Sequence, residues 1–244
     1  MNELYKRFNM KKINNTKQDR YLSQKNAFTM IELIMVIVVI GILVTVAFPR
    51  LDRDLKQEAA DNILSAIRHT QHMALTDNRH KFNRIDWQKA LWQIRFTKNT
   101  AGDIWSYTIG SNSDYAPPSS GTSIDKNESV LDPMNGKFIF NQSPSSPQDD
   151  ESPNIFLTKK YGIETITLNS GCHGTLNSSA MHIAFDNLGR PHRGVTSGAT
   201  NDYNTYINNG NCQITFASPA FDSNLTIEIK QETGYAFILG QEDS

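Results

Sequence analysis

One carboxylate, that of Glu32, lies within an otherwise uncharged apolar run of 21 residues, 28–48. Burying this charge in hydrocarbon costs on the order of a few kcal/mol unless a cation meets it. A free α-amine at Phe28, produced by cleavage between Ala27 and Phe28, would supply that cation. In a bundle of staggered helices this amine could neutralise Glu32 of the next subunit and favour one axial register. The predicted chemistry is therefore ion pairing that guides assembly.

Two cysteines, Cys172 and Cys212, suggest a second kind of chemistry. Both follow the apolar run, so they would meet oxidising conditions in a compartment outside the cytoplasm. A bond between them would close a loop of about 40 residues and contribute roughly 3–4 kcal/mol of stability. We expect this disulfide. The competing interpretation is a nucleophile pair of Cys172 with His173, which is disfavoured because sequence neighbours do not by themselves form a dyad.

Two further clusters contain groups that bind ligands in other proteins. Arg190, His192 and Arg193 form a small basic cluster that could contact phosphate groups, and a solvated turn is the competing interpretation. Four residues near the end of a predicted helix invite comparison with a metal site: His69, His72, Asp77 and His80. No convincing ligand set is completed there. We therefore predict no metal and no cofactor.

Composition and charge narrow the classes of function. Residues 1–27 hold seven Lys or Arg and two Asp or Glu, a net charge of +5. The remaining residues hold 17 and 23, a net charge of −6, which disfavours a general nucleic-acid binder. The P-loop, Rossmann glycine, HExxH and GxSxG signatures do not occur in the sequence. We therefore expect no enzymatic activity.

The helices that must position these residues follow from the hydropathy pattern. A helix over 28–48 would span roughly 30 Å, the hydrocarbon thickness of a bilayer. The basic leader before it should stay in the cytoplasm, which places the rest of the chain across the membrane. Apolar residues recur every three to four positions over 51–80, and this spacing predicts a continuing amphipathic helix with a kink at Pro49.

Beyond residue 82 the pattern changes to alternation with a period of two, which is typical of half-buried antiparallel strands. The alternating segments are 92–96, 105–109, 138–140, 183–185, 214–216, 225–229 and 235–239. We predict an α+β fold in which one long helix packs on one or two antiparallel sheets. The expected parts are a basic leader (1–27), a transmembrane helix (28–48), an amphipathic helix extension (49–81) and a β-rich periplasmic domain (82–244).

The segment Ala-Phe-Thr-Met-Ile-Glu-Leu at 27–33 resembles the processing motif of type IV prepilins, usually a Gly followed by Phe-Thr-Leu-Ile-Glu-Leu. The leader, the apolar run and Pro49 agree with that family, whereas Ala27 and Met30 depart from it. The resemblance implies that a prepilin peptidase cuts after Ala27 and that the new Phe28 amine is N-methylated. A cleaved secretory signal and a plain signal anchor are the alternatives.

Two later segments resemble H-type pseudopilins of type II secretion and FimT-like minor pilins. Residues 183–191 match their F-x-x-x-G-x-P strand and turn, and residues 225–235 resemble their last hairpin. This resemblance implies a minor pseudopilin anchored in the bacterial inner membrane, with its C-terminal domain in the periplasm. The implied partners are other pilin-like subunits, the prepilin peptidase, the inner-membrane assembly platform and membrane lipid.

Two alternative functions stay open at this point. One is a minor pilin of a type IV pilus or DNA-uptake filament, in which Arg190 and Arg193 would contact DNA. The other is a membrane-anchored periplasmic protein of a different function.

Overall fold

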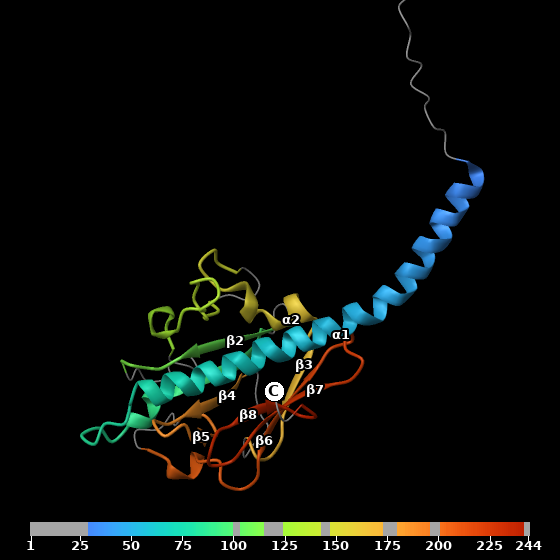
Figure 1. The fold of residues 1–244 in the computed structure, drawn as a ribbon. Coiled ribbons are helices and arrows are strands. Elements are labelled where there is room, and N and C mark those ends of the chain that lie inside the picture. Colours follow the sequence, from blue (N-terminus) through green and yellow to red (C-terminus); the bar gives the residue numbers. More distant parts are fainter. Residues whose placement is uncertain are drawn as a thin grey trace, which may run out of the picture. The chain divides into compact units, whose positions relative to one another are not determined.

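The computed structural model describes residues 29–99, 103–114, 124–142, 147–172, 180–195 and 201–241, apart from the side chains of 45–54 and 180. Contacts within the chain define two compact units, Met1–Thr45 and Val46–Ser244. The predicted α+β class is confirmed, because the described residues form one long helix followed by two antiparallel sheets of four strands each (Figure 1).

Helix α1, Met30–Thr76, begins in the first unit. The hydroxyl oxygen of Thr29 accepts a hydrogen bond from the Glu32 amide at 3.3 Å, so Thr29 caps the start of the helix. Every described side chain between residues 29 and 44 is exposed. Within the described residues, no helix is both long enough and apolar enough to cross a membrane. The transmembrane helix expected over 28–48 stays a prediction.

In the second unit, α1 presents an apolar stripe to the protein core. Ala59, Ile63 and Ile67 are fully buried, and Leu55 is packed against them at the edge of the core. Their spacing of three to four residues places these side chains on one face of the helix. The amphipathic character predicted for this part of the chain is therefore confirmed.

The helix ends at Thr76, five residues before the predicted boundary at 81. Beyond that point the side-chain oxygen of Asn78 accepts a hydrogen bond from the His80 amide at 2.8 Å. Such a local turn offers the backbone an alternative partner and so competes with continuation of the helix.

All strand pairs in both sheets are antiparallel. The first sheet has the order β2-β1-β4-β5, formed by Ile104–Gly110, Trp92–Asn99, Ala180–Phe185 and Pro191–His192. The second has the order β3-β6-β7-β8, formed by Thr165–Leu168, Cys212–Ala217, Leu225–Ile229 and Ala236–Ile238. The chain therefore leaves the second sheet after β3, adds β4 and β5 to the first sheet, and returns as β6.

Short helices lie in the connections between α1, β1 and the later strands. Helix α2, Leu157–Tyr161, ends at Gly162, whose φ of 67° is the left-handed conformation that favours glycine at a helix C-terminus. Four 3-10 helices occur among the described residues: Trp87–Ala90, Lys126–Glu128, Pro153–Ile155 and Tyr203–Thr205.

The two sheets and the later half of α1 share one hydrophobic core. Phe96 of β1 meets Phe216 of β6 edge to face, with ring centroids 5.6 Å apart, so the two sheets are joined by direct aromatic packing. Complete burial of a side chain such as Phe96 or Ile63 contributes roughly 1.5–3 kcal/mol. This shared core makes the helix and both sheets one packing unit.

The strand predicted over 138–140 is wrong. Among the described residues, Phe138 forms only isolated bridges, to Leu131 and to Glu151. The buried side chain of this segment is Ile139, which lies between the two aromatic residues in the sequence. The Phe138 amide bonds to the carbonyl of Asp150 at 2.8 Å, so neighbouring loops satisfy the backbone in place of a regular ladder.

The alternation predicted for the last strand is only partly correct. Of its three residues, Phe237 is 2% exposed, whereas Tyr235 and Leu239 are 46% and 48% exposed and lie outside β8. All three residues of β8 are buried, so both faces of this strand are covered. Ile238 lies opposite the fully buried Ile227, and the Phe237 ring is covered by Lys230 and by the ring of Tyr235.

We predict that Gly234→Ala destabilises the protein more than Gly136→Ala. Both glycines have a φ of +69°, so both substitutions cost about 1–2 kcal/mol in backbone strain. A Cβ at Gly234 would in addition overlap the carbonyl oxygen of Gly189 and the side chain of Gln71, whereas nothing lies within 4 Å of a Cβ at Gly136. The overlap should add roughly 1–3 kcal/mol, measured by urea unfolding of the full chain in detergent. Equal losses would contradict this packing.

Candidate functional site

The processing signal begins outside the described part of the chain. Ala27 and Phe28 lie there, so cleavage and N-methylation at these residues stay predictions. Glu32 lies in the first turn of α1 with an exposed side chain, accessible to a group from another chain. Its amide bonds to Thr29, which the sequence analysis overlooked although Thr-x-x-Glu is the pattern of a capping box. The cap uses only the backbone amide of Glu32, so its exposed carboxylate can act as an anionic partner.

Pro49 lies within α1, which is helical from Met30 to Thr76. Its side chain is outside the described set. The kink predicted at this residue, and its role in assembly, stay predictions.

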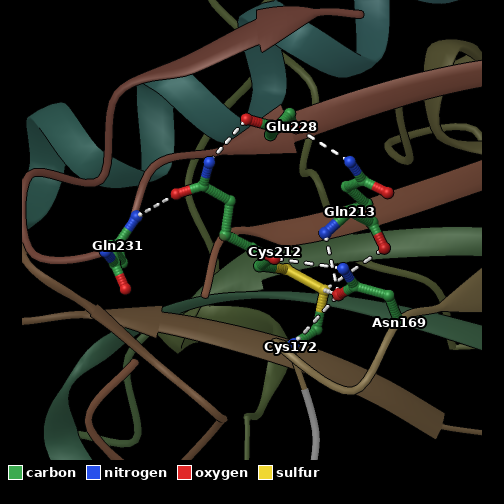
Figure 2. Close-up of a disulfide and its surroundings, with 7 residues drawn as sticks. Asn169, Cys172, Cys212, Gln213, Glu228 and Gln231 are labelled. Atoms are coloured by element: carbon green, nitrogen blue, oxygen red, sulfur yellow. Dashed lines mark hydrogen bonds between the residues drawn. A yellow bond between two sulfur atoms is a disulfide. The ribbon is translucent and has the colours of Figure 1, made fainter. Parts of the chain in front are cut away.

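The disulfide between Cys172 and Cys212 is confirmed, with an S–S distance of 2.04 Å (Figure 2). Both residues are buried. Since neither sulfur is a free thiol, the alternative of a Cys172 nucleophile is excluded in this state. His173 lies outside the described residues. The bond links the end of the loop after β3 to the start of β6. Between these two points the chain contributes β4 and β5 to the other sheet.

A polar network surrounds the disulfide. The side-chain oxygen of Asn169 accepts hydrogen bonds from the Cys172 amide at 3.2 Å and the Gln213 amide at 3.0 Å. Figure 2 shows Asn169 beside the sulfur atoms and Glu228 above the disulfide, with a dashed line to Gln213. These two bonds connect the loop after β3 to Gln213, the second residue of β6.

Glu228 is the buried charge of this network. Its two carboxylate oxygens accept from Asn211 at 2.7 Å and from Gln213 at 2.8 Å, and Lys230 lies 2.9 Å away. Burial alone would raise the pKa of the Glu228 carboxyl, but the bonds from Gln213 and Lys230 outweigh it and lower that pKa. The network is satisfied within the chain, so its role is to hold the fold around the disulfide.

We predict that the double variant Cys172→Ala, Cys212→Ala loses about 3–4 kcal/mol of unfolding free energy. The bond joins residues 40 positions apart, and its loss restores the loop entropy of the unfolded chain. Urea unfolding of the full chain in detergent measures the change. Wild type that has been unfolded, reduced and alkylated should refold no better than the variant; an unchanged midpoint in the variant would contradict the prediction.

The basic cluster is organised around a carboxylate that the sequence analysis did not single out. Asp186 accepts from the Arg190 side chain at 2.6 and 2.7 Å and from the Arg190 amide at 2.9 Å. The His192 ring lies 3.6 Å from the same carboxylate, and its other nitrogen is 3.1 Å from the Thr205 hydroxyl. The guanidinium of Arg190 also lies over the Tyr206 ring. Asp-x-x-x-Arg spacing in the sequence is the signal that could have revealed this pair.

This pairing changes the electrostatics of the cluster. Burial alone would raise the pKa of Asp186, but its contacts with His192 and Arg190, and two backbone amides, lower that pKa to about 2. Asp186 is therefore ionised at neutral pH and balances the charge of Arg190. Arg193 is held by its backbone, whose amide bonds to the Thr205 carbonyl at 2.6 Å. The three predicted residues are close together, but the Arg190 guanidinium is already paired with the Asp186 carboxylate.

We predict that Asp186→Asn lowers the unfolding free energy at pH 7 by about 2 kcal/mol. A folded-state pKa of about 2, against an ordinary value of 3.8, means that the carboxylate stabilises the fold above about pH 4. This contribution is lost as the pH falls from about 4 through 2. Unfolding of both proteins in detergent between pH 7 and pH 2 should show the difference closing over that window; a gap that persists at pH 2 would contradict the assignment.

The four residues considered for a metal site do not come together as one ligand set, although His69 and His72 line the same hollow beside α1. His72 is exposed, and His80 packs against the rings of Phe82 and Trp87. Asp77 accepts from the indole of Trp92 at 3.3 Å. His69 lines a cavity beside α1. In the part of the chain that the structure describes, no group of three or more His, Cys, Asp or Glu residues could hold a metal ion.

Comparison with protein families identifies the N-terminal signal. The family model of the prokaryotic N-terminal methylation motif matches residues 22–48. The chain therefore carries a type IV pilin-like signal, which confirms the resemblance seen at 27–33. This signal implies processing by a prepilin peptidase, anchoring in the inner membrane and assembly with other pilin subunits. No curated protein and no solved structure gave a significant match to the chain.

Proposed function

We propose that this protein is a minor pseudopilin of a type II secretion system, a structural subunit without a reaction of its own. The observation that carries the proposal is the methylation motif at 22–48, which overlaps the start of a helix that enters a disulfide-bonded α+β domain. The H-type resemblance supports the finer assignment. Residues 183–191 run from the second half of β4 through a turn to the first residue of β5, and residues 225–235 contain β7 and the turn before β8.

The proposed mechanism begins with cleavage after Ala27. The new Phe28 amine, once methylated, remains a cation and can pair with Glu32 of a neighbouring subunit in the membrane. The inner-membrane platform then adds the subunit to a pseudopilus, with the domain beyond the anchor in the periplasm. The exposed apolar side chains at the start of α1 supply the surface for contact with lipid and with neighbouring helices.

The alternative of a DNA-binding minor pilin receives less support. Arg190 is neutralised by Asp186, and the chain beyond the leader has a net charge of −6. Both features weaken attraction to phosphate. Binding of the purified full chain to duplex DNA, with and without Arg190→Ala and Arg193→Ala, separates the two functions. Saturable binding that falls in these variants would favour the DNA-uptake filament.

We predict that Glu32→Gln impairs assembly but leaves membrane insertion intact. Glutamine removes the charge but keeps the size and polarity of the side chain, and the cap bond from the backbone amide is retained, so the variant isolates the charge. Subunit incorporation into filaments is measured by crosslinking in cells that carry the assembly machinery. The control is Asp103→Asn, which makes the same chemical change at an exposed site near Lys98. Normal assembly of Glu32→Gln would contradict ion pairing by this carboxylate.

Processing is tested by the intact mass and N-terminal sequence of the membrane-extracted protein. We expect an N-methylated Phe28 start that depends on the prepilin peptidase. An uncut chain, or a start at Phe48, would reject the pilin-like mechanism and favour a plain anchor or a secreted protein.

A further inference from the structure

The chain contains two Asn-Gly pairs, Asn135-Gly136 and Asn209-Gly210. Because glycine has no Cβ, its backbone nitrogen can approach the side chain of the preceding asparagine closely. Attack of this nitrogen on the side-chain carbonyl carbon is the first step of spontaneous deamidation, which converts asparagine to aspartate or isoaspartate. Both asparagines are exposed to solvent. Exposure therefore does not distinguish the two pairs, and their hydrogen bonds decide which of them can react.

The side chain of Asn135 is held by three hydrogen bonds. Its Nδ2 atom donates to the carboxylate of Asp132 and to the hydroxyl of Ser152, both at 3.0 Å. Its Oδ1 atom accepts from the Lys137 amide at 2.9 Å. A bond to a charged group such as the Asp132 carboxylate is among the stronger hydrogen bonds in proteins. Deamidation at Asn135 requires that these bonds break, because the amide nitrogen that must leave is itself the donor in two of them.

The side chain of Asn209 has no such restraint. Asn209 lies between the buried Ile207 and the start of β6 at Cys212. Among the described residues, its side-chain amide has no hydrogen-bond partner. Its carbonyl carbon can therefore turn toward the Gly210 nitrogen without the loss of a side-chain hydrogen bond.

The attacking amides of the two pairs are matched. The Gly210 amide donates to Oε1 of Gln231 at 2.8 Å, and the Gly136 amide donates to the Asp132 carbonyl at 2.8 Å. Both glycines have a positive φ, of 98° and 69°. Each amide must give up its acceptor and its proton before its nitrogen attacks, so this step favours neither pair. The difference between the pairs lies in the asparagine side chains.

We propose that Asn209 is a site of spontaneous deamidation and that the fold protects Asn135. The Gly210 nitrogen loses its proton to a base from the solvent and forms a bond to the Cγ atom of Asn209. The Cγ–Nδ2 bond breaks, and ammonia leaves with a proton from the solvent. Water then opens the resulting cyclic imide at either carbonyl, which gives aspartate or isoaspartate. The reaction consumes water, releases ammonia and needs no enzyme, oxidant or reductant.

The modification would act on the polar network around the disulfide. Asn211, which follows Gly210, donates to Glu228 at 2.7 Å and accepts from the Gln231 amide at 3.1 Å. Either product places a carboxylate where a neutral amide stood, and isoaspartate also lengthens the main chain at this position. The segment that leads into β6 therefore changes in charge and in path. This inference does not depend on which machine the subunit serves.

The test is peptide mapping by mass spectrometry of the full chain, incubated in detergent at pH 8. We expect deamidation at Asn209 to be about tenfold faster than at Asn135, because Asn135 must first lose a hydrogen bond to a charged group. Both aspartate and isoaspartate should appear at Asn209, and the rate should rise with pH, since the attacking nitrogen must lose its proton. In urea the two rates should converge, because unfolding releases the Asn135 side chain.

Variants assign the reaction to this pair. Asn209→Gln should abolish the mass change in its peptide, because the longer side chain would have to close a larger ring. Asn208→Gln, the same change at the exposed neighbouring residue, should leave the reaction at Asn209 unchanged. Equal rates at Asn135 and Asn209 in the folded chain, no reaction at Asn209, a rate difference that persists in urea, or an unchanged mass change in Asn209→Gln would overturn the proposal.

Discussion

The burial of one face of α1 is the constraint on which the rest of the globular unit depends. Ala59 and Ala60 are small and fully or almost fully buried, so the helix backbone can lie close to the strands. Polar side chains at the edges of that face then fix the position of the helix. Arg68 donates to the carbonyl of Ala236 at 2.9 and 3.2 Å, and Gln71 donates to the carbonyls of Gly189 and Thr233. One helix thereby organises the turns before β5 and before β8.

This constraint has a functional consequence for a filament subunit. The helix whose start overlaps the methylation motif is also the helix whose later half forms part of the core. A subunit held by its anchor helix would therefore transmit load into packed apolar contacts and both sheets. The disulfide joins the two ends of the segment between β3 and β6. This segment carries β4 and β5 of the other sheet, so its ends stay together in the second sheet.

The buried carboxylates of the described residues divide into two kinds. Asp186 and Glu228 are each matched by a cation and by neutral donors, and this arrangement is the usual solution for a carboxylate inside a protein. Asp132 and Glu151 accept from neutral donors alone, among them backbone amides of the adjoining loops. The first kind stabilises turns and strand ends. The second kind fixes the backbone of loops between the strands.

The sequence by itself determined the processing motif, the amphipathic half of α1, the cysteine pair and the α+β class, because these depend on local composition and on periodicity over many residues. Only the tertiary structure decided which carboxylate pairs with Arg190 and that both faces of β8 are buried. Strands as short as β3 and β5 carry too few residues for a periodic signal, and the second face of β8 is covered by side chains from outside that strand. The cavity beside α1 is lined by residues of that helix and by residues of later loops and of α2, a proximity that packing alone produces.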